Sequence, residues 1–168
     1  MRLSLLARGE DAPYQTFEEI YERHFTMVYR VCFSYLKNQA DAEDAVADVF
    51  VKLLRHDTAF KDADHEKAWL LRISINLCKD HLKHWWRKRT DIADYADAEA
   101  ESPYTENELL ATIMSLPERY KDVIYLYYYE GYSTVEIAGI LKKPQSTIRN
   151  HLREARALLK GVLEDEEQ

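Results

Sequence analysis

Apolar residues recur at steps of three and four along most of the chain, which is the period of an amphipathic helix. The first such stretch, residues 17–36, has a stripe made of Ile20, His24, Met27, Val31 and Tyr35, widened by Val28 and Cys32. Only four glycines and four prolines are present, which leaves little material for hairpin turns. The pattern predicts an all-α protein. Because His24 has no metal-spaced partner beside it, it is interpreted as a core or boundary histidine.

Two more helices are predicted in the N-terminal half. Asp41 is expected to cap a helix that runs to about Arg55. Its inward residues are Ala45, Val46, Val49, Phe50, Leu53 and Leu54. After a polar connection that contains Phe60, a third helix is predicted from about His65 to Lys88. Its core stripe is Trp69, Leu70, Ile73, Leu77 and Leu82.

The composition changes abruptly between residues 91 and 108, which hold seven acidic residues and no Lys or Arg. Such a stretch is typical of a flexible linker at a domain boundary. We therefore predict two small helical domains, residues 1–91 and 108–168, joined by an acidic flexible linker at 92–107. Because basic surfaces are predicted on both sides of it, the linker could also compete with DNA for them, an autoinhibitory hypothesis.

The second domain begins with two predicted helices. Pro117 ends the first, whose apolar residues are Leu109, Leu110, Ile113 and Leu116. Gly131 ends the second, since glycine readily takes a positive φ. Its apolar residues are Tyr120, Val123, Ile124 and Tyr127, with Leu126 and Tyr128 beside them. Tyr127 is expected in the core, and a disordered acidic tail is expected from Glu164 to Gln168.

Residues 132–160 have the pattern of a helix-turn-helix. Ser133 and Glu136 have the capping-box spacing, and Pro144 predicts a turn. The first helix has an apolar face made of Val135, Ile137, Ala138, Ile140 and Leu141. The second begins near Gln145 or Ser146, with an inward stripe of Ile148, Leu152, Ala155 and Leu159. Four polar residues project from it: Arg149, Asn150, Arg153 and Arg156.

Charge turns this pattern into a functional hypothesis. Residues 142–160 hold six cations and one acid, a net charge of +5, in a chain whose net charge is −7. Arginine pairs with guanine edges and asparagine with adenine, whereas lysines and helix N-termini suit phosphates. The predicted phosphate contacts are Lys142, Lys143, Ser146 and Thr147. DNA binding is favoured over an ordinary solvated basic face.

Two other surfaces stand out. Residues 79–89 hold five cations, one acid and two tryptophans, Trp85 and Trp86, a combination that suits a single or opening strand. The alternative is a basic helix end whose tryptophans pack on a neighbour. The second helix carries four acids off its apolar face, Asp41, Glu43, Asp44 and Asp48. They favour the helix dipole, or they form a docking face.

Other chemistry finds little support. No nucleophilic triad, phosphate-binding glycine loop or convincing two-metal carboxylate cluster is present, so no catalytic residue and no cofactor are predicted. The spacing of Cys78, His81 and His84 places these residues on different sides of a helix, so no metal site is predicted. Cys32 and Cys78 are expected as buried free thiols. No signal peptide or membrane-spanning run is found, so a cytoplasmic protein without membrane insertion is expected.

The order of these segments resembles the bacterial RNA polymerase sigma factors of the sigma-70 family, specifically the extracytoplasmic-function (ECF) group. Residues 17–89 and 109–163 carry the resemblance. The matching phrases are ADAEDAVADVFVKLLR, AWLLRISINLCKDHLKHWWRKR, LPERYKDVIYLYYYEGYSTVEIAGIL and STIRNHLREARALLK. The resemblance implies a non-catalytic subunit with region 2 and region 4 domains that binds core polymerase and promoter DNA, and an anti-sigma factor as a further partner.

The resemblance also implies residue roles. Asp41, Glu43, Asp44 and Asp48 become candidates for docking on the clamp helices of the largest polymerase subunit. The loop from Phe60 and the helix after it are similar to the part that captures a flipped base and engages the −10 element. The candidates there are Phe60, Lys61, Asn76, Lys79, Lys83, Trp86 and Arg87. Arg149, Asn150 and Arg153 correspond to positions that read the −35 element.

Two departures from the family pattern are visible. Ala47 stands where many members have glutamine, which predicts a clamp contact that is either weaker or differently distributed. Residues 60–64 differ from the loops expected, so the base preference is not assigned. The alternatives are a free-standing regulator, which would not need the acidic and Trp-rich N-terminal segments, and a nuclease, for which the carboxylates are not suitably grouped.

Overall fold

The computed structural model describes residues 16–57, 59–89, 112–113 and 115–166. All regular elements in these ranges are helical, which confirms the predicted fold class. The chain divides into two compact units, Met1–Tyr104 and Thr105–Gln168. The acidic segment lies outside the described residues, so its predicted bounds stay a prediction. None of the helices described has the length and apolar character needed to cross a membrane.

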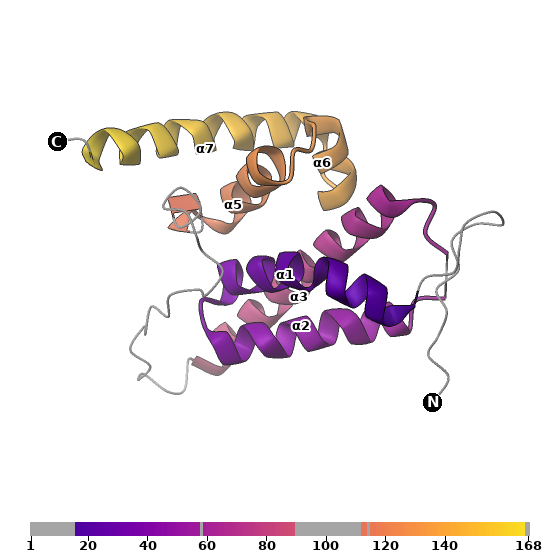
Figure 1. The fold of residues 1–168 in the computed structure, drawn as a ribbon. Helices are drawn as coiled ribbons and strands as arrows, with labels where there is room; N and C mark the ends of the chain where they lie inside the picture. The colour runs from indigo at the N-terminus through magenta and orange to yellow at the C-terminus, as the bar shows by residue number, and fades with distance from the viewer. Residues whose placement is uncertain (1–15, 58, 90–111, 114, 167–168) are drawn as a thin grey trace. The chain divides into compact units, whose positions relative to one another are not determined.

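The first unit contains α1 (Phe17–Leu36), α2 (Gln39–Leu54) and α3 (Ala63–Arg89), each of which packs against the other two (Figure 1). All three supply fully buried side chains, including Ile20, Cys32, Ala45, Val49, Leu53, Leu70, Leu71 and Cys78. Cys32 and Cys78 are buried free thiols, as the sequence predicts. Burial of these apolar side chains stabilises the unit at about 25 cal/mol per Å².

Local signals at the helix ends were partly misjudged from the sequence. Asn38, not Asp41, caps α2, because its side-chain oxygen accepts from the Asp41 backbone N–H at 3.0 Å. Asp41 lies in the first turn of α2 instead. Lys37 has φ 52° at the end of α1, where its N–H donates to the Phe33 carbonyl at 2.8 Å. This left-handed residue turns the chain directly into the Asn38 cap. At the other end of α2, Leu54 is 43% exposed, contrary to prediction.

The buried face of α3 also differs from the predicted stripe. Leu70 is buried as expected, whereas Trp69, Ile73, Leu77 and Leu82 are only partly buried. The other buried residues are Glu66, Leu71, Ser74, Ile75 and Cys78. Because α3 contacts both α1 and α2, its buried face is wider than one stripe and includes polar side chains. Ser74, for example, donates to the Leu70 carbonyl at 2.7 Å.

The second unit contains α5 (Glu118–Ile124), η1 (Tyr125–Tyr129), α6 (Thr134–Leu141) and α7 (Gln145–Glu166). Helix α7 packs against α5 and α6 (Figure 1). The core of this second unit includes Ile113, Val123, Ile124, Leu126, Ile137, Ile148, Leu152 and Ala155. Leu109 and Leu110 lie outside the described residues. Helix α7 continues to Glu166, so the disordered tail predicted from Glu164 is wrong at least that far.

The tyrosine run forms a π-helix, η1, which the sequence did not predict. The wider turn of a π-helix shifts the following side chains around the axis. Tyr125, the first residue of η1, is the buried tyrosine of this run at 5% exposure, while the later Tyr128 is 51% exposed and Tyr127 is only partly buried. The prediction of Tyr127 as the core residue was wrong for this reason. Gly131 follows at φ 77°, as predicted for the end of the helix.

Candidate nucleic-acid interface

The helix-turn-helix forms as the sequence predicts. The Glu136 backbone N–H donates to the Ser133 hydroxyl at 3.2 Å, and the Ser133 N–H donates to the Glu136 carboxylate at 2.8 Å. This backbone bond from Ser133 is the main cause that lowers the pKa of Glu136. Ile137 and Ile140 are buried, but Val135 is 63% exposed and does not belong to the predicted apolar face.

The turn between the two helices is fixed by backbone geometry. Lys142 takes φ 53°, and the Lys143 N–H donates to the Ala138 carbonyl at 3.1 Å. The Gln145 amide then donates to the Thr134 hydroxyl at 3.1 Å, which joins the start of α7 to the start of α6. Helix α7 is thereby held at a defined angle to α6, as a reading helix requires.

One face of α7 is packed and the other is open. Ile148, Leu152 and Ala155 are buried, as predicted. The predicted readers Arg149, Asn150 and Arg153 are exposed. Among the predicted phosphate contacts, Lys142 and Ser146 are exposed and Lys143 and Thr147 are partly buried. The structure therefore brings the predicted −35 residues together at the turn and along the first turns of α7.

Arg156 differs from the other arginines of α7. Its Nε donates to the Tyr128 hydroxyl, and its guanidinium lies 5.4 Å and 5.5 Å from the ring centroids of Tyr127 and Tyr128. Such cation–π contacts hold an arginine in place. Arg156 thus links α7 to η1, a contact that the linear sequence did not reveal.

The one acid among the cations of residues 142–160 is also engaged. Tyr120 donates from its hydroxyl to the Glu154 carboxylate at 2.8 Å, and Arg119 donates to the same hydroxyl at 2.9 Å. Since Tyr120 and Arg119 belong to α5, these bonds direct Glu154 toward α5. The contacts fix the rotation of α7 about its own axis.

The acidic face of α2 is open to solvent. Asp41, Glu43, Asp44 and Asp48 are all exposed, as a docking surface requires. Glu43 accepts from the Gln39 amide at 2.9 Å, and Asp48 contacts His81 of α3 at 3.3 Å. These contacts leave the four carboxylates on the exposed surface of one helix.

The predicted −10 residues differ from one another in their exposure to solvent. Lys61, Asn76 and Lys83 are exposed, and Lys79 is partly buried. Phe60 is 2% exposed, so its ring lies in the core rather than on the surface. The side chains of Trp86 and Arg87 lie outside the described part of the chain.

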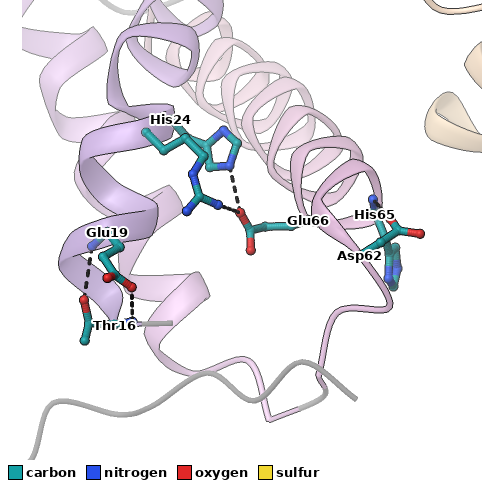
Figure 2. A network of polar contacts seen from close by, with 7 residues as sticks. Thr16, Glu19, His24, Asp62, His65 and Glu66 are labelled. Carbon is teal, nitrogen blue, oxygen red and sulfur yellow. Dashed lines mark hydrogen bonds and ion pairs between the residues drawn. The ribbon is translucent and has the colours of Figure 1, made fainter. Parts of the chain in front are cut away.

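A polar network that the sequence did not predict lies beside the loop between α2 and α3 (Figure 2). Glu66 of α3 is fully buried, and its Oε1 is 2.8 Å from His24 Nε2 and 3.2 Å from Arg23 Nη1 of α1. The signal available was His24 on the apolar face of α1, which requires a polar partner once it is buried. No residue pattern identified Glu66 as that partner.

Among the residues that the structure describes, no group of three His, Cys, Asp or Glu side chains could hold a metal ion. Cys78 is fully buried, whereas His84 is exposed. These two side chains therefore lie on different sides of α3.

Comparison with known proteins identifies both halves of the chain. The model of sigma-70 region 2 matches residues 20–88, and the model of sigma-70 region 4 matches residues 106–159. The ECF RNA polymerase sigma factor SigE of Mycolicibacterium smegmatis is 29% identical over 94% of this chain. The ECF RNA polymerase sigma factor SigW of Bacillus subtilis is 25% identical over 98% of it. The matched regions span 65% of the first relative and 96% of the second.

Solved structures show the same fold. The sigma factor RpoE of Bartonella quintana, in complex with the anti-sigma factor NepR, has a TM-score of 0.72 at 21% identity. That match covers 88% of this chain and 96% of the other. CnrH in complex with the cytosolic domain of CnrY has a TM-score of 0.61 at 23% identity, over 89% and 88% of the two chains.

Proposed function

The chain belongs to the sigma-70 family of RNA polymerase sigma factors, in its ECF group with region 2 and region 4 domains, and from this premise we propose how its surfaces divide the work of transcription initiation. It is a non-catalytic subunit that binds core polymerase reversibly. Region 4 reads the −35 element, and region 2 docks on the polymerase and engages the −10 element as the strands open.

For region 4, the proposed readers are Arg149, Asn150 and Arg153. Their exposure on α7 leaves their donors and acceptors available to base edges in the major groove. Lys142, Lys143 and the start of α7 at Ser146 and Thr147 suit the flanking phosphates, because the helix N-terminus offers N–H groups and a partial positive charge. This arrangement fixes register through phosphates and sequence through bases.

For region 2, the carboxylates of Asp41, Glu43, Asp44 and Asp48 are proposed to contact the clamp helices of the largest polymerase subunit. Lys61, Asn76, Lys79 and Lys83, with Trp86 and Arg87, are proposed to follow the −10 strand. Trapping of extruded bases lowers the free energy of the opened promoter, since a duplex hides its base faces.

One arrangement supports this function above all: an exposed acidic helix in one unit and an exposed Arg/Asn face on a helix-turn-helix in the other. A free-standing repressor needs only the second. The test is transcription with core polymerase on a promoter library randomised at the −35 and −10 elements. Enrichment of defined sequences at both elements is expected. Tight, specific duplex binding without polymerase, together with no transcription, would favour the repressor instead.

Regulation by an anti-sigma factor is also proposed. Among proteins of the same fold, RpoE has been solved with the anti-sigma factor NepR, and CnrH has been solved with the cytosolic domain of CnrY. A binding protein that covers the α2 acidic face or the α7 reading face would block initiation. Since polymerase and chromosomal DNA are its proposed partners, the protein is proposed to act in the cytoplasm.

A further inference from the structure

In the loop between α2 and α3, the described residues, 55–57 and 59–62, pack around Phe60. The Phe60 ring stacks on His56 at a centroid distance of 4.7 Å and an interplanar angle of 18°. It meets the edges of His65 and Trp69, each at 5.6 Å, and His56 also lies 4.6 Å from Trp69. Because Phe60 is almost completely buried, it anchors the loop and does not offer its ring to a base.

The end of this loop and the first turn of α3 form one hydrogen-bonded piece. The Lys61 N–H donates to His65 Nδ1 at 3.0 Å, and the His65 N–H donates to Asp62 Oδ1 at 2.7 Å. The Glu66 N–H donates to the Asp62 carbonyl at 3.1 Å. The backbone at Lys61 is thus fixed to α3, while the Lys61 side chain is exposed.

Glu66 connects this piece to α1. Its carboxylate lies against His24, as Figure 2 shows, and its Oε1 is also 3.2 Å from Arg23 Nη1. Glu66 is fully buried, whereas the Arg23 side chain is 42% exposed. A buried carboxylate is costly unless it is paired and hydrogen-bonded. The network therefore favours one position of the α3 N-terminus relative to α1, and a shift of α3 would break these bonds.

We propose that Glu66 is a positioning residue for base discrimination at the −10 element. Held by His24 and Arg23, it sets the first turn of α3, and with it the loop that presents Lys61. The buried Phe60 ring anchors the loop through its contacts with His56, His65 and Trp69. This inference rests on the proposed −10 contact and deepens it, because it explains how a short loop keeps one shape when a strand arrives.

The test uses the full chain in holoenzyme with core polymerase. The probes are fluorescent single-stranded −10 oligonucleotides whose sequence comes from the promoter library, with single-base substitutions. The measured quantity is the ratio of affinities for cognate and substituted strands. Glu66→Ala should lower this ratio about tenfold, the scale of one base-pair mismatch. Glu66→Gln keeps an acceptor oxygen toward His24 and should retain most of the ratio.

Ser74→Ala is the matched control, because Ser74 is equally buried on α3 but bonds only within its own helix at Leu70. It should leave the ratio unchanged. Arg23→Ala, a change at a partly exposed side chain, should lower the ratio partially, and it replaces Glu66→Ala if that variant does not fold. Binding of −35 duplex and of core polymerase should stay at wild-type levels for Glu66→Ala and Arg23→Ala.

Unchanged discrimination in both Glu66→Ala and Arg23→Ala would overturn the positioning role while leaving the proposed function intact. An equal loss in Ser74→Ala, or a parallel loss of core binding, would also overturn it, since the effect would then be general destabilisation. Absence of discrimination in the wild-type holoenzyme would instead contradict the proposed −10 contact itself.

Discussion

Residues of the same type have different surroundings on α7, and those surroundings separate their roles. Arg149 and Arg153 are exposed, whereas Arg156 donates to Tyr128 and lies against two tyrosine rings. The sequence placed all three arginines on one projecting face. Side-chain contacts, which depend on the unforeseen π-helix, distinguish them.

Alanine substitutions should reveal this difference. Arg149→Ala and Arg153→Ala should each cost about 1–3 kcal/mol of binding at particular −35 base pairs, because each removes a proposed bidentate base contact. Arg156→Ala should instead lower the free energy of unfolding and change −35 discrimination little. Binding to a panel of single-substituted −35 duplexes, with thermal unfolding of each variant, measures both. Equal discrimination profiles for the three variants would contradict the separation.

Asp122 predicts a pH dependence of stability. Burial raises the pKa of this carboxyl from 3.8 to about 7, with Lys143 opposing the shift. The folded state therefore binds a proton more tightly than the unfolded state. The contribution of Asp122 to the free energy of unfolding is therefore largest below pH 4. It falls by roughly 1.4 kcal/mol per pH unit as the pH rises toward 7, and it no longer changes above pH 7. Asp122→Asn, which cannot ionise, should lack this loss.

The measurement is thermal unfolding of wild type and Asp122→Asn from pH 4 to pH 8, followed by circular dichroism. The stability difference between them cancels the other titrating groups. It should shift in favour of Asp122→Asn as the pH rises. A difference that is constant with pH would show that Asp122 does not titrate in this window.

Helix ends show which elements a sequence predicts well. The Ser133–Glu136 capping box, the Gly131 end and the start of α7 were all predicted, because each depends on residues within one turn. The cap of α2 was misassigned to Asp41. Asn38 and Asp41 are both good caps, and only the left-handed Lys37 decides where the helix begins.

Substitutions at these two residues should behave oppositely. Asn38→Ala should lower stability by about 1 kcal/mol through loss of the α2 cap, with little effect on polymerase binding. Asp41→Ala should weaken core polymerase binding with a smaller change in stability. Unfolding followed by tryptophan fluorescence reports on the first unit, since Trp69, Trp85 and Trp86 all lie there. A larger stability loss in Asp41→Ala would contradict the assigned cap.

Tertiary packing explains the elements that were misread. The rotation of α3 follows from contacts with two helices and from the Glu66–His24 pair, neither of which local periodicity encodes. In the run Tyr125–Tyr129, every residue except Leu126 is a tyrosine, so the pattern holds no signal for which ring is buried. The candidate surfaces were nevertheless predictable, because exposed charges stand out against an apolar stripe, as at Arg149 and Asp44. The role of Phe60 was not predictable from the sequence, since an aromatic residue in a loop fits a base contact or a core anchor equally well.

At the scale of the whole molecule, charge is separated by position along the chain. Residues 142–160 are strongly positive and residues 79–89 are positive. Residues 91–108, which run from just after the first matched region into the start of the second, carry seven acidic residues and no Lys or Arg. The net charge of −7 conceals this pattern. Local charge, not the total, determines which surfaces attract DNA.

Neutralising the acidic segment should therefore strengthen DNA binding. We expect replacement of its seven acids by Asn and Gln to increase affinity of the free protein for promoter duplex by about fivefold at low salt, the scale of weak exposed charge pairs. The gain should shrink as salt rises, because screening weakens the competition between the segment and DNA. Anisotropy titrations at several salt concentrations measure this. Neutralising Glu164, Asp165 and Glu166 at the end of α7 is the control, and unchanged affinity after neutralising the acidic segment would remove the autoinhibitory hypothesis.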